Sequence, residues 1–199
     1  MAQIIPEMSP AAATIFRNIQ YVFLDRDGVL NRKAPEGAYI TRPEDLELLP
    51  GAGDAIARIN RFRQKAIVVT NQRAIALGLC TDNDLYRIHE TLCSLLSAHD
   101  AHLDAIYYCP HDYGQCNCRK PKTGMFEQAF RDFRNANTSN SVMIGDSPTD
   151  VEAGWRLGMR TILIGEQCDW HLDAEFVKPD ASAESLLDCV ERLLGFATP

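Results

Sequence analysis

Tyr21-Val22-Phe23-Leu24-Asp25-Arg26-Asp27-Gly28 joins a short apolar run to two aspartates and a glycine. The apolar run is continuous rather than alternating, and this pattern predicts a buried strand that is covered on both faces. Because the run ends abruptly at Asp25, we expect the acidic residues to lie just beyond the carboxyl end of the strand. That end of a strand is where ligands bind in open α/β sheets.

Four further apolar runs have the same character, and amphipathic stretches separate them. They predict strands at residues 66–70, 105–108, 142–144 and 161–164, and helical spacing marks residues 52–64, 85–96, 125–133 and 186–194. This alternation predicts an α/β fold, a Rossmann-like parallel sheet with helices on both faces. Because a chain of 199 residues buries a sizeable core, we expect a single domain over residues 1–199.

The composition excludes several classes of protein. With 46% hydrophobic and 24% charged residues, the chain is ordinary for a soluble globular protein and unlike a collagen, a coiled coil or a disordered chain. A net charge of -7 argues against a non-specific nucleic-acid binder. No apolar run reaches the roughly 18 residues of a membrane span, and the patch at residues 11–16 is too short for a signal peptide. We therefore expect a cytoplasmic monomer with no nucleic-acid or membrane partner.

Polar side chains follow the ends of four predicted strands, which share one edge of a parallel sheet. In chain order they are Asp25 and Asp27, Thr70 and Asn71, Arg119 and Lys120, and Asp146 and Asp150. Carboxylates gathered in this way raise one another's pKa unless a cation lies between them, and oxygen ligands favour Mg²⁺. The spacing lets the Asp25 side chain and the Asp27 backbone carbonyl face one metal, which leaves the Asp27 side chain free.

This set of groups suits phosphoryl transfer. One carboxylate can attack phosphorus, and a second can protonate the leaving oxygen and then deprotonate water. A hydroxyl, a lysine and Mg²⁺ stabilise the charge on the transferring group. Each motif alone also has a plainer interpretation, since D-x-D-G is usually a turn and Thr-Asn a turn or a helix cap. Their joint occurrence, each after an apolar strand, favours the chemical interpretation.

Four segments resemble the motifs of the haloacid dehalogenase (HAD) superfamily of phosphatases, and the resemblance extends from about residue 19 to about residue 194. The segments are Asp25-Arg26-Asp27-Gly28-Val29-Leu30-Asn31, Val69-Thr70-Asn71-Gln72, Arg119-Lys120-Pro121 and Gly145-Asp146-Ser147-Pro148-Thr149-Asp150. The resemblance implies that Asp25 is the nucleophile and Asp27 the acid/base. It implies that Thr70 and Lys120 bind the phosphoryl group, with Asn71 beside them, and that Asp146 is a Mg²⁺ ligand supported by Asp150.

A cysteine cluster follows the third predicted strand. Cys109-x-His111-x4-Cys116-x-Cys118 supplies four Zn²⁺ ligands, which close a structural tetrahedron with no open position. We expect the metal to hold the loop at residues 109–121 and to orient Arg119 and Lys120. The alternatives are a set of merely buried or reactive thiols, and a zinc knuckle for RNA, which the acidic composition disfavours.

This loop, placed ahead of Arg119-Lys120-Pro121 in lieu of a large cap, resembles the D-glycero-D-manno-heptose 1,7-bisphosphate phosphatases. It is also similar to the histidinol-phosphate phosphatases of the same subgroup. The first resemblance implies removal of the 7-phosphate from a small phosphorylated sugar, in the carbohydrate metabolism that supplies bacterial lipopolysaccharide. The second implies a step in histidine synthesis.

The segment after the second strand departs from the heptose enzymes, which usually read Thr-Asn-Gln-Ser-Gly-Ile-Ala-Arg-Gly. This chain has Thr70-Asn71-Gln72-Arg73-Ala74-Ile75-Ala76-Leu77-Gly78. The usual arginine is Leu77, and a new cation appears at Arg73. We expect Arg73 to bind a second phosphate or another acidic group of the substrate. The alternative is a surface arginine at the start of a helix.

Two hypotheses of another class remain, a phospho-receiver domain and a non-catalytic scaffold. In a receiver domain the acceptor aspartate lies on a later strand than the acidic pair, whereas here D-x-D follows the first strand. A scaffold would not need the catalytic set, which is intact.

Overall fold

The computed structural model describes residues 18–165, 177–193 and 195. The predicted domain of residues 1–199 is therefore only partly described. The apolar patch at residues 11–16 lies outside the described residues.

Six parallel strands form one sheet, in the order β3-β2-β1-β4-β5-β6. The strands are β1 (Tyr21–Leu24), β2 (Lys65–Asn71), β3 (Ala105–Cys109), β4 (Ser141–Gly145), β5 (Arg160–Ile164) and β6 (Ala181–Ala183). The continuous apolar runs became strands as predicted, and β1, β2, β4 and β5 are mostly buried. The prediction of a buried strand was wrong for β3, whose residues 105–108 are half-buried or exposed because β3 lies at an edge of the sheet. Strand β6 was not predicted, because its three residues are small or polar and it forms only by pairing with β5.

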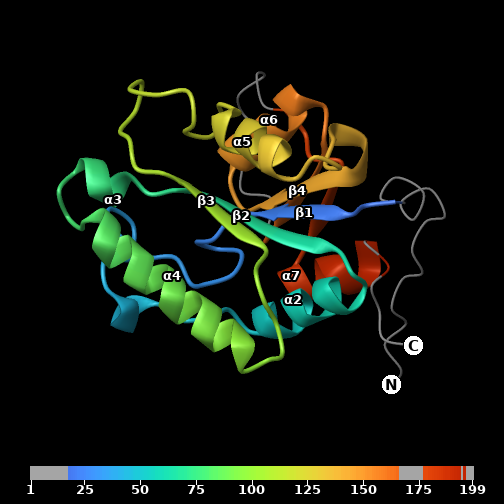
Figure 1. The fold of residues 1–199 in the computed structure, drawn as a ribbon, viewed down its shortest axis with the longest axis horizontal. Helices are drawn as coiled ribbons and strands as arrows, with labels where there is room; N and C mark the ends of the chain where they lie inside the picture. The colour runs from blue at the N-terminus through green and yellow to red at the C-terminus, as the bar shows by residue number, and fades with distance from the viewer. Residues whose placement is uncertain (1–17, 166–176, 194, 196–199) are drawn as a thin grey trace.

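Helices cover both faces of the sheet (Figure 1). Helices α5 (Gly124–Asp132) and α6 (Pro148–Leu157) lie on one face, and α2 (Ala52–Arg61), α4 (Asp82–Ser97) and α7 (Leu186–Asp188) lie on the other. A short helix, α3 (Arg73–Ala76), follows β2, and a π-helical turn, η4 (Cys189–Leu193), continues α7. Two 3₁₀ turns complete the described elements, η1 (Pro43–Asp45) and η2 (Thr138–Asn140). These layers confirm the predicted fold class.

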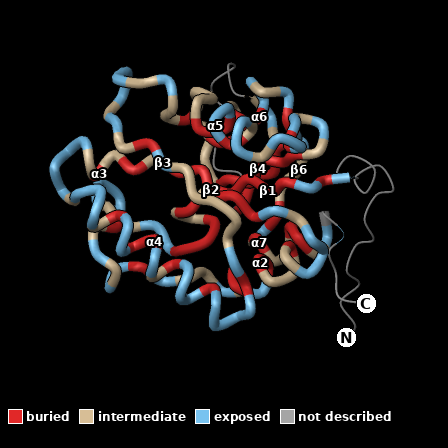
Figure 2. The backbone as a smooth tube through the Cα atoms, viewed as in Figure 1, coloured by how far each residue is buried: buried red, intermediate tan, exposed pale blue. Residues whose placement is uncertain are grey.

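The sheet separates two hydrophobic clusters. Figure 2 shows that the residues of the central strands are buried. One cluster joins Leu24 and Val68 of the sheet to Ile56 of α2 and Leu92 of α4. The other joins the opposite faces of the same strands to α5, where the ring of Phe126 lies 5.3 Å from that of Phe23. Because neighbouring strand residues point to opposite faces, each apolar run fills both clusters.

Two helices that border the site begin at residues with specific caps. Thr81 accepts a hydrogen bond from the backbone N–H of Asp84, and the Asp84 carboxylate accepts one from the Thr81 N–H at the start of α4. Ser147 precedes α6, and Pro148 is the first residue of that helix, a position that proline favours. These caps fix where each helix begins and hence which way its first turn faces.

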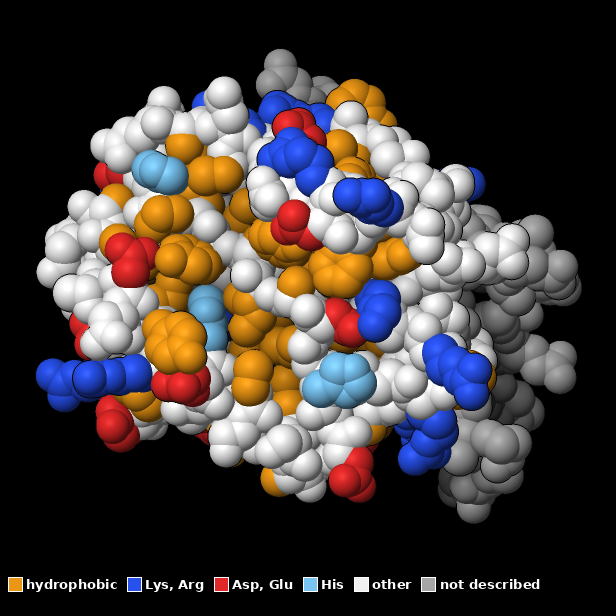
Figure 3. All heavy atoms as spheres, in the orientation of Figure 1, with side chains coloured by type: hydrophobic (Ala, Val, Ile, Leu, Met, Phe, Trp, Pro, Cys, Tyr) orange, Lys and Arg blue, Asp and Glu red, His pale blue; other side chains and the backbone are white. Residues whose placement is uncertain are grey.

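No helix among the described residues is long and apolar enough to cross a membrane. On the face shown in Figure 3, lysine and arginine side chains are interspersed with aspartate and glutamate side chains.

Candidate active site

The register of the sheet brings the predicted strand-end residues together. Leu24 pairs with Val68 of β2 on one side and with Ile144 of β4 on the other. Beyond this level β1 ends at once, β4 runs one residue further and β2 three, so Asp25, Asp146 and Thr70, which lies near the end of β2, meet at one edge of the sheet. This edge is the carboxyl end of a parallel sheet, which is where the sequence placed the site.

Three carboxylates form a cluster at this edge. Asp25, Asp146 and Asp150 each offer a carboxylate oxygen, and these oxygens all lie within 4.8 Å of one another. Burial raises the pKa of Asp25 to about 7; the Lys120 charge opposes this effect, and the three other aspartates add to it. Burial also raises the pKa of Asp146, against the ion pair that Lys33 forms with it. Such a cluster favours a bound divalent cation.

Lys120 is the buried cation of the site. Its Nζ lies 2.9 Å from Asp25 Oδ1 and 2.6 Å from Asp150 Oδ1, and it donates to the Val69 carbonyl at 2.7 Å. Burial alone would lower the pKa of Lys120, but the two carboxylates outweigh it and raise the pKa above its usual value. The ammonium therefore stays charged beside the predicted nucleophile.

Asn71 fixes the backbone of this lysine. Its side chain accepts a hydrogen bond from the Lys120 N–H at 3.0 Å and donates one to the Lys120 carbonyl at 3.2 Å. The end of β2 is thus joined to the loop that follows the cysteine cluster. Asn71 was predicted to bind substrate, but its side chain is engaged with the backbone of Lys120.

Asp27 points away from the carboxylate cluster into a separate set of donors. Its carboxylate accepts hydrogen bonds from Arg26 Nη2 at 2.9 and 3.0 Å, from Asn31 Nδ2 at 2.9 Å and from Gln72 Nε2 at 3.0 Å. Burial alone would raise the pKa of Asp27, but Arg26 and these donors lower it below the usual range. Asp25 and Asp27 therefore have different electrostatic surroundings although only one residue separates them.

Gly28 allows the loop after β1 to pass close to Asp146. Its φ of +94° is left-handed, and a Cβ at this position would collide with the Asp146 carboxylate and the Lys33 side chain. Beside this contact is a cavity of about 550 Å³, whose lining includes Lys33, Asp146 and Glu184. A second hollow, of about 280 Å³, lies between Lys33, Tyr39 and Glu47.

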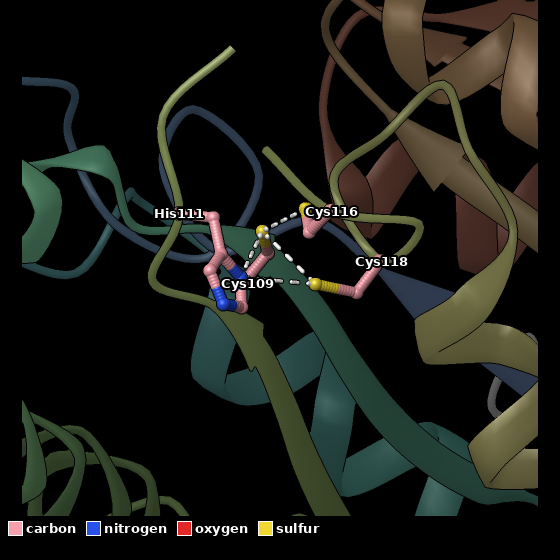
Figure 4. Close-up of side chains that lie close together, drawn as sticks. All are labelled: Cys109, His111, Cys116 and Cys118. Atoms are coloured by element: carbon pink, nitrogen blue, oxygen red, sulfur yellow. Dashed lines mark hydrogen bonds between the residues drawn. The ribbon is translucent and has the colours of Figure 1, made fainter. Parts of the chain in front are cut away.

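The four predicted zinc ligands point toward one another (Figure 4). Cys109 Sγ lies 3.5 Å from Cys116 Sγ and 3.2 Å from Cys118 Sγ, and His111 Nδ1 lies 3.4 Å from Cys118 Sγ. Tetrahedral ligands at Zn–S distances of about 2.3 Å lie about 3.8 Å apart, so this cluster has nearly the size of a zinc site. Together with the three aspartates, it is one of two groups of potential metal ligands among the described residues.

Arg73 contacts the loop of the cysteine cluster. Its Nε and Nη2 lie 2.5 and 3.2 Å from the two carboxylate oxygens of Asp112, and its guanidinium lies 4.7 Å from the Tyr113 ring centre. The guanidinium of Arg119 lies 4.4 Å from the same ring. Arg73 is therefore a bridge between α3 and this loop, which neither of the two predictions for it had included.

Comparison with known proteins gives consistent matches. Residues 117–189 match a family model described as HAD-hydrolase-like. A D-glycero-beta-D-manno-heptose-1,7-bisphosphate 7-phosphatase of Vibrio cholerae is 36% identical over 151 residues, which are 72% of this chain and 79% of the relative. A D-glycero-D-manno-heptose-1,7-bisphosphate 7-phosphatase of Thermosynechococcus vestitus is 36% identical over 194 residues, 89% of this chain and 97% of the relative. The chain belongs to the HAD phosphatase family.

The solved structures agree with this membership. The D,D-heptose 1,7-bisphosphate phosphatase from B. bronchiseptica, complexed with magnesium and phosphate, has a TM-score of 0.81 at 29% identity. The match covers 89% of this chain and 99% of that one. As a HAD phosphatase, the chain is a phosphoric monoester hydrolase, so the enzymatic prediction is confirmed over the receiver-domain and scaffold hypotheses.

The sequence analysis missed four residues that the structure brings to this edge. Arg26 and Gln72 hold Asp27, Lys33 pairs with Asp146, and Asp112 pairs with Arg73. Gln72 stands next to a predicted site residue, and that position was the available signal. Arg26 lies between Asp25 and Asp27, and Asp112 follows His111, so the same signal was present for both, whereas Lys33 has no predicted site residue beside it.

Proposed function

We propose that this HAD phosphatase removes the 7-phosphate from D-glycero-D-manno-heptose 1,7-bisphosphate in a Mg²⁺-dependent reaction. The observation that carries the proposal is the pairing of Asp25 with Lys120 beside Asp146, with Asp27 held separately. The named relatives favour the heptose bisphosphate over histidinol phosphate as substrate. They include enzymes named for the alpha and for the beta anomer, so the proposal covers both anomers.

The reaction proceeds in two steps on this chain's own carboxylates. Asp25 attacks phosphorus and forms an aspartyl-phosphate as the P–O bond to the sugar breaks. Asp27 takes up a proton from solvent and gives it to the departing sugar oxygen, and later takes one from the water that hydrolyses the aspartyl-phosphate. Lys120 and the Thr70 hydroxyl hold the phosphoryl oxygens.

The residues at the carboxylate cluster fit Mg²⁺. Asp146 Oδ1 is buried and has no hydrogen-bond partner among the described residues, as expected of an oxygen reserved for a cation. Asp25 and Asp146 would hold the ion with the Asp27 backbone carbonyl, and Asp150 would support them through Lys120. When bound, Mg²⁺ supplies positive charge that neutralises the transferring phosphoryl group.

The residues at the cysteine cluster fit Zn²⁺ with Cys109, His111, Cys116 and Cys118 as ligands. The two residues after Cys118 are Arg119 and Lys120, so a metal here would fix the backbone on which the catalytic ammonium depends. The site would be structural, because all four ligands come from the protein.

Arg119 and Arg73 provide positive charge for the second phosphate. Nε and Nη1 of Arg119 are buried without hydrogen-bond partners among the described residues, so they are available to an anion. Arg73 is already paired with Asp112, so we propose that it acts on the substrate indirectly. It contacts the Tyr113 ring, which also lies against Arg119, and so holds Arg119 in place for the substrate.

Phosphate release from heptose 1,7-bisphosphate, from each anomer separately, and from histidinol phosphate tests this function, with and without Mg²⁺. We expect the heptose to be preferred and Asp25→Asn to abolish turnover while the far-UV circular dichroism spectrum stays unchanged. Substantial residual turnover in Asp25→Asn would refute the assignment of Asp25 as the nucleophile. A preference for histidinol phosphate would refute the proposed heptose substrate and indicate a role in histidine synthesis.

We further propose that the chain acts as a cytoplasmic monomer and a single domain, on a small phosphorylated sugar and without nucleic acid or membrane. The acidic composition supports this part of the proposal. Sedimentation equilibrium of the full chain tests it, and a stable dimer would contradict it.

A further inference from the structure

Arg26 lies between the two catalytic aspartates in sequence, and its side chain is fully buried. Its relative solvent exposure is 0%, and among the described residues it is the one buried arginine. Burying a guanidinium costs several kcal/mol unless its donors are satisfied. The N–H donors of a buried guanidinium therefore need hydrogen-bond acceptors, and the structure provides three accepting side chains.

The three partners come from different parts of the fold. The carboxylate of Asp27 accepts from Arg26 Nε at 3.2 Å and from Nη2 at 2.9 Å, and Gln72 Oε1 accepts from Nη2 at 3.2 Å. His89, on the buried side of α4, lies with its Nε2 3.3 Å from Arg26 Nη1. Arginine can only donate, so Nε2 of His89 is the acceptor and its ring proton is on Nδ1.

His89 is fitted to the role of a neutral acceptor. Burial, with the Arg26 charge second, lowers the pKa of His89 to about 4, so the ring is uncharged near neutral pH. Its ring packs edge-on against Tyr108, at a centroid distance of 6.0 Å, and the Tyr108 hydroxyl donates to Asp82 in the first turn of α4. These contacts fix the ring, and through it the guanidinium.

The network reaches the phosphoryl site through Gln72. Its Nε2 donates to Asp27 at 3.0 Å and to the Thr70 hydroxyl at 2.8 Å. A continuous chain of side chains thus runs from His89 through Arg26 and Asp27 to Thr70. Each of these side chains except Asp27 is at most 9% exposed.

We propose that Arg26 and His89 are positioning residues that set the orientation of the Asp27 carboxylate for proton transfer to the leaving oxygen. The proposal rests on the proposed function. In the step concerned, Asp25 forms a bond to phosphorus and the P–O bond to the alcohol breaks. The departing oxygen receives a proton from Asp27, which takes that proton up from solvent, because its carboxylate is ionised in the free enzyme. Since general acids contribute only when they are within hydrogen-bond reach, a carboxylate that turns freely loses this contribution.

The dependence of kcat/KM on the leaving group tests the proposal, because this parameter covers the steps up to departure of the alcohol. An alkoxide needs the proton of Asp27, whereas 4-nitrophenolate leaves without it. For His89→Leu we expect kcat/KM to fall about tenfold or more with the heptose bisphosphate, and by less than about threefold with 4-nitrophenyl phosphate. A series of phenyl phosphates of intermediate acidity should show a steeper leaving-group dependence than in the wild type.

Two further variants separate positioning from mere loss of stability. His89→Gln keeps an acceptor for Arg26 and should recover most of the activity on the heptose substrate. Leu92→Val shortens another buried residue of α4, one turn further on, and should leave the leaving-group dependence unchanged. An equal loss on both substrates in His89→Leu, or an unchanged slope across the phenyl series, would overturn the proposal. A wild-type enzyme that hydrolyses none of these esters would instead refute the proposed function.

Discussion

At the scale of single residues, the site depends on charges that are buried in pairs. Lys120 and Arg26 are both buried cations, and each is paired with one of the two aspartates that we propose as catalytic. Lys120 faces Asp25 and Asp150, whereas Arg26 faces Asp27. This division assigns a separate cation to each carboxylate, so the two aspartates can perform different chemistry although they are nearly adjacent in the chain.

The pH dependence of stability follows from His89. Its pKa is about 4 in the folded protein and 6.5 when unperturbed, so the unfolded chain binds more protons between these values. Stability due to His89 is complete above about pH 6.5 and is lost as the pH falls toward 4. We expect the stability of the wild type relative to His89→Gln to fall by about 2 kcal/mol between pH 7.5 and pH 5.

Urea unfolding of both proteins at the two pH values measures this difference. Other titrating groups are common to both proteins and cancel. A difference that stays constant with pH would contradict the depressed pKa of His89.

The positions of the predicted site residues at one edge of the sheet followed from the sequence, whereas the contacts between their side chains did not. Asp25, Thr70, Lys120 and Asp146 were predictable because each follows an apolar strand, and parallel strands end at one edge. The role of Arg26 was not predictable, because an arginine in a polar turn is usually exposed. Its burial depends on His89, which lies 63 residues further along the chain.

At the scale of elements, the loop after β3 connects the cysteine cluster to the catalytic lysine. Residues 110–123 contain no helix or strand, so their order depends on contacts made by side chains. Asn71 anchors the loop to β2, Arg73 anchors it to α3, and the four potential zinc ligands cross-link it. The backbone at Lys120 is therefore held by side-chain contacts to β2 and α3 and by the cysteine cluster.

Removal of metal from the cysteine cluster should loosen this loop. We expect a zinc chelator, with excess Mg²⁺ present, to speed amide exchange at residues 109–121, to lower Tm and to reduce kcat/KM about tenfold or more. Hydrogen exchange followed by mass spectrometry locates the change. Cys80→Ser alters a thiol outside the cluster and serves as the control. Unchanged activity and Tm after complete zinc loss would contradict the structural role of the cluster.

The ion pair between Arg73 and Asp112 makes a separate prediction for the same loop. Asp112→Ala should raise KM for the heptose bisphosphate about twofold to fivefold, because an exposed pair contributes modestly. The double variant Arg73→Asp, Asp112→Arg restores opposite charges and should recover part of the loss. If Arg73→Ala alone had the full effect and the reversed pair recovered nothing, Arg73 would contact the substrate directly.

At the scale of the whole molecule, one sheet supports two cores. Ile56 belongs to the cluster beneath α2, and Ile67 belongs to the cluster beneath α5, on opposite faces of the sheet. The two side chains share no cluster, yet both pack on the same strands. The domain should therefore unfold as one unit, and the two clusters should contribute independently to its stability.

Truncations on the two faces test this expectation. Ile56→Val and Ile67→Val should each cost about 0.5–1.5 kcal/mol in the free energy of unfolding. The double variant should lose the sum within about 0.5 kcal/mol, in a single transition with an unchanged m value. Two separate transitions would show that the faces unfold independently and would contradict a single domain.

The central place of β1 in the sheet determines the order in which the site can form during synthesis on the ribosome. As β1 emerges, it can pair with β2 and then extend the sheet to β3, but its other edge stays open until β4 is synthesised. Asp25, Thr70 and Lys120 therefore exist in the nascent chain before Asp146 and Asp150. Until then Lys120 lacks one of its two carboxylates, and the cation site is incomplete. On the proposed mechanism, an incompletely synthesised chain would lack the full Mg²⁺ site, so binding of the ion would show that β4 has joined the sheet.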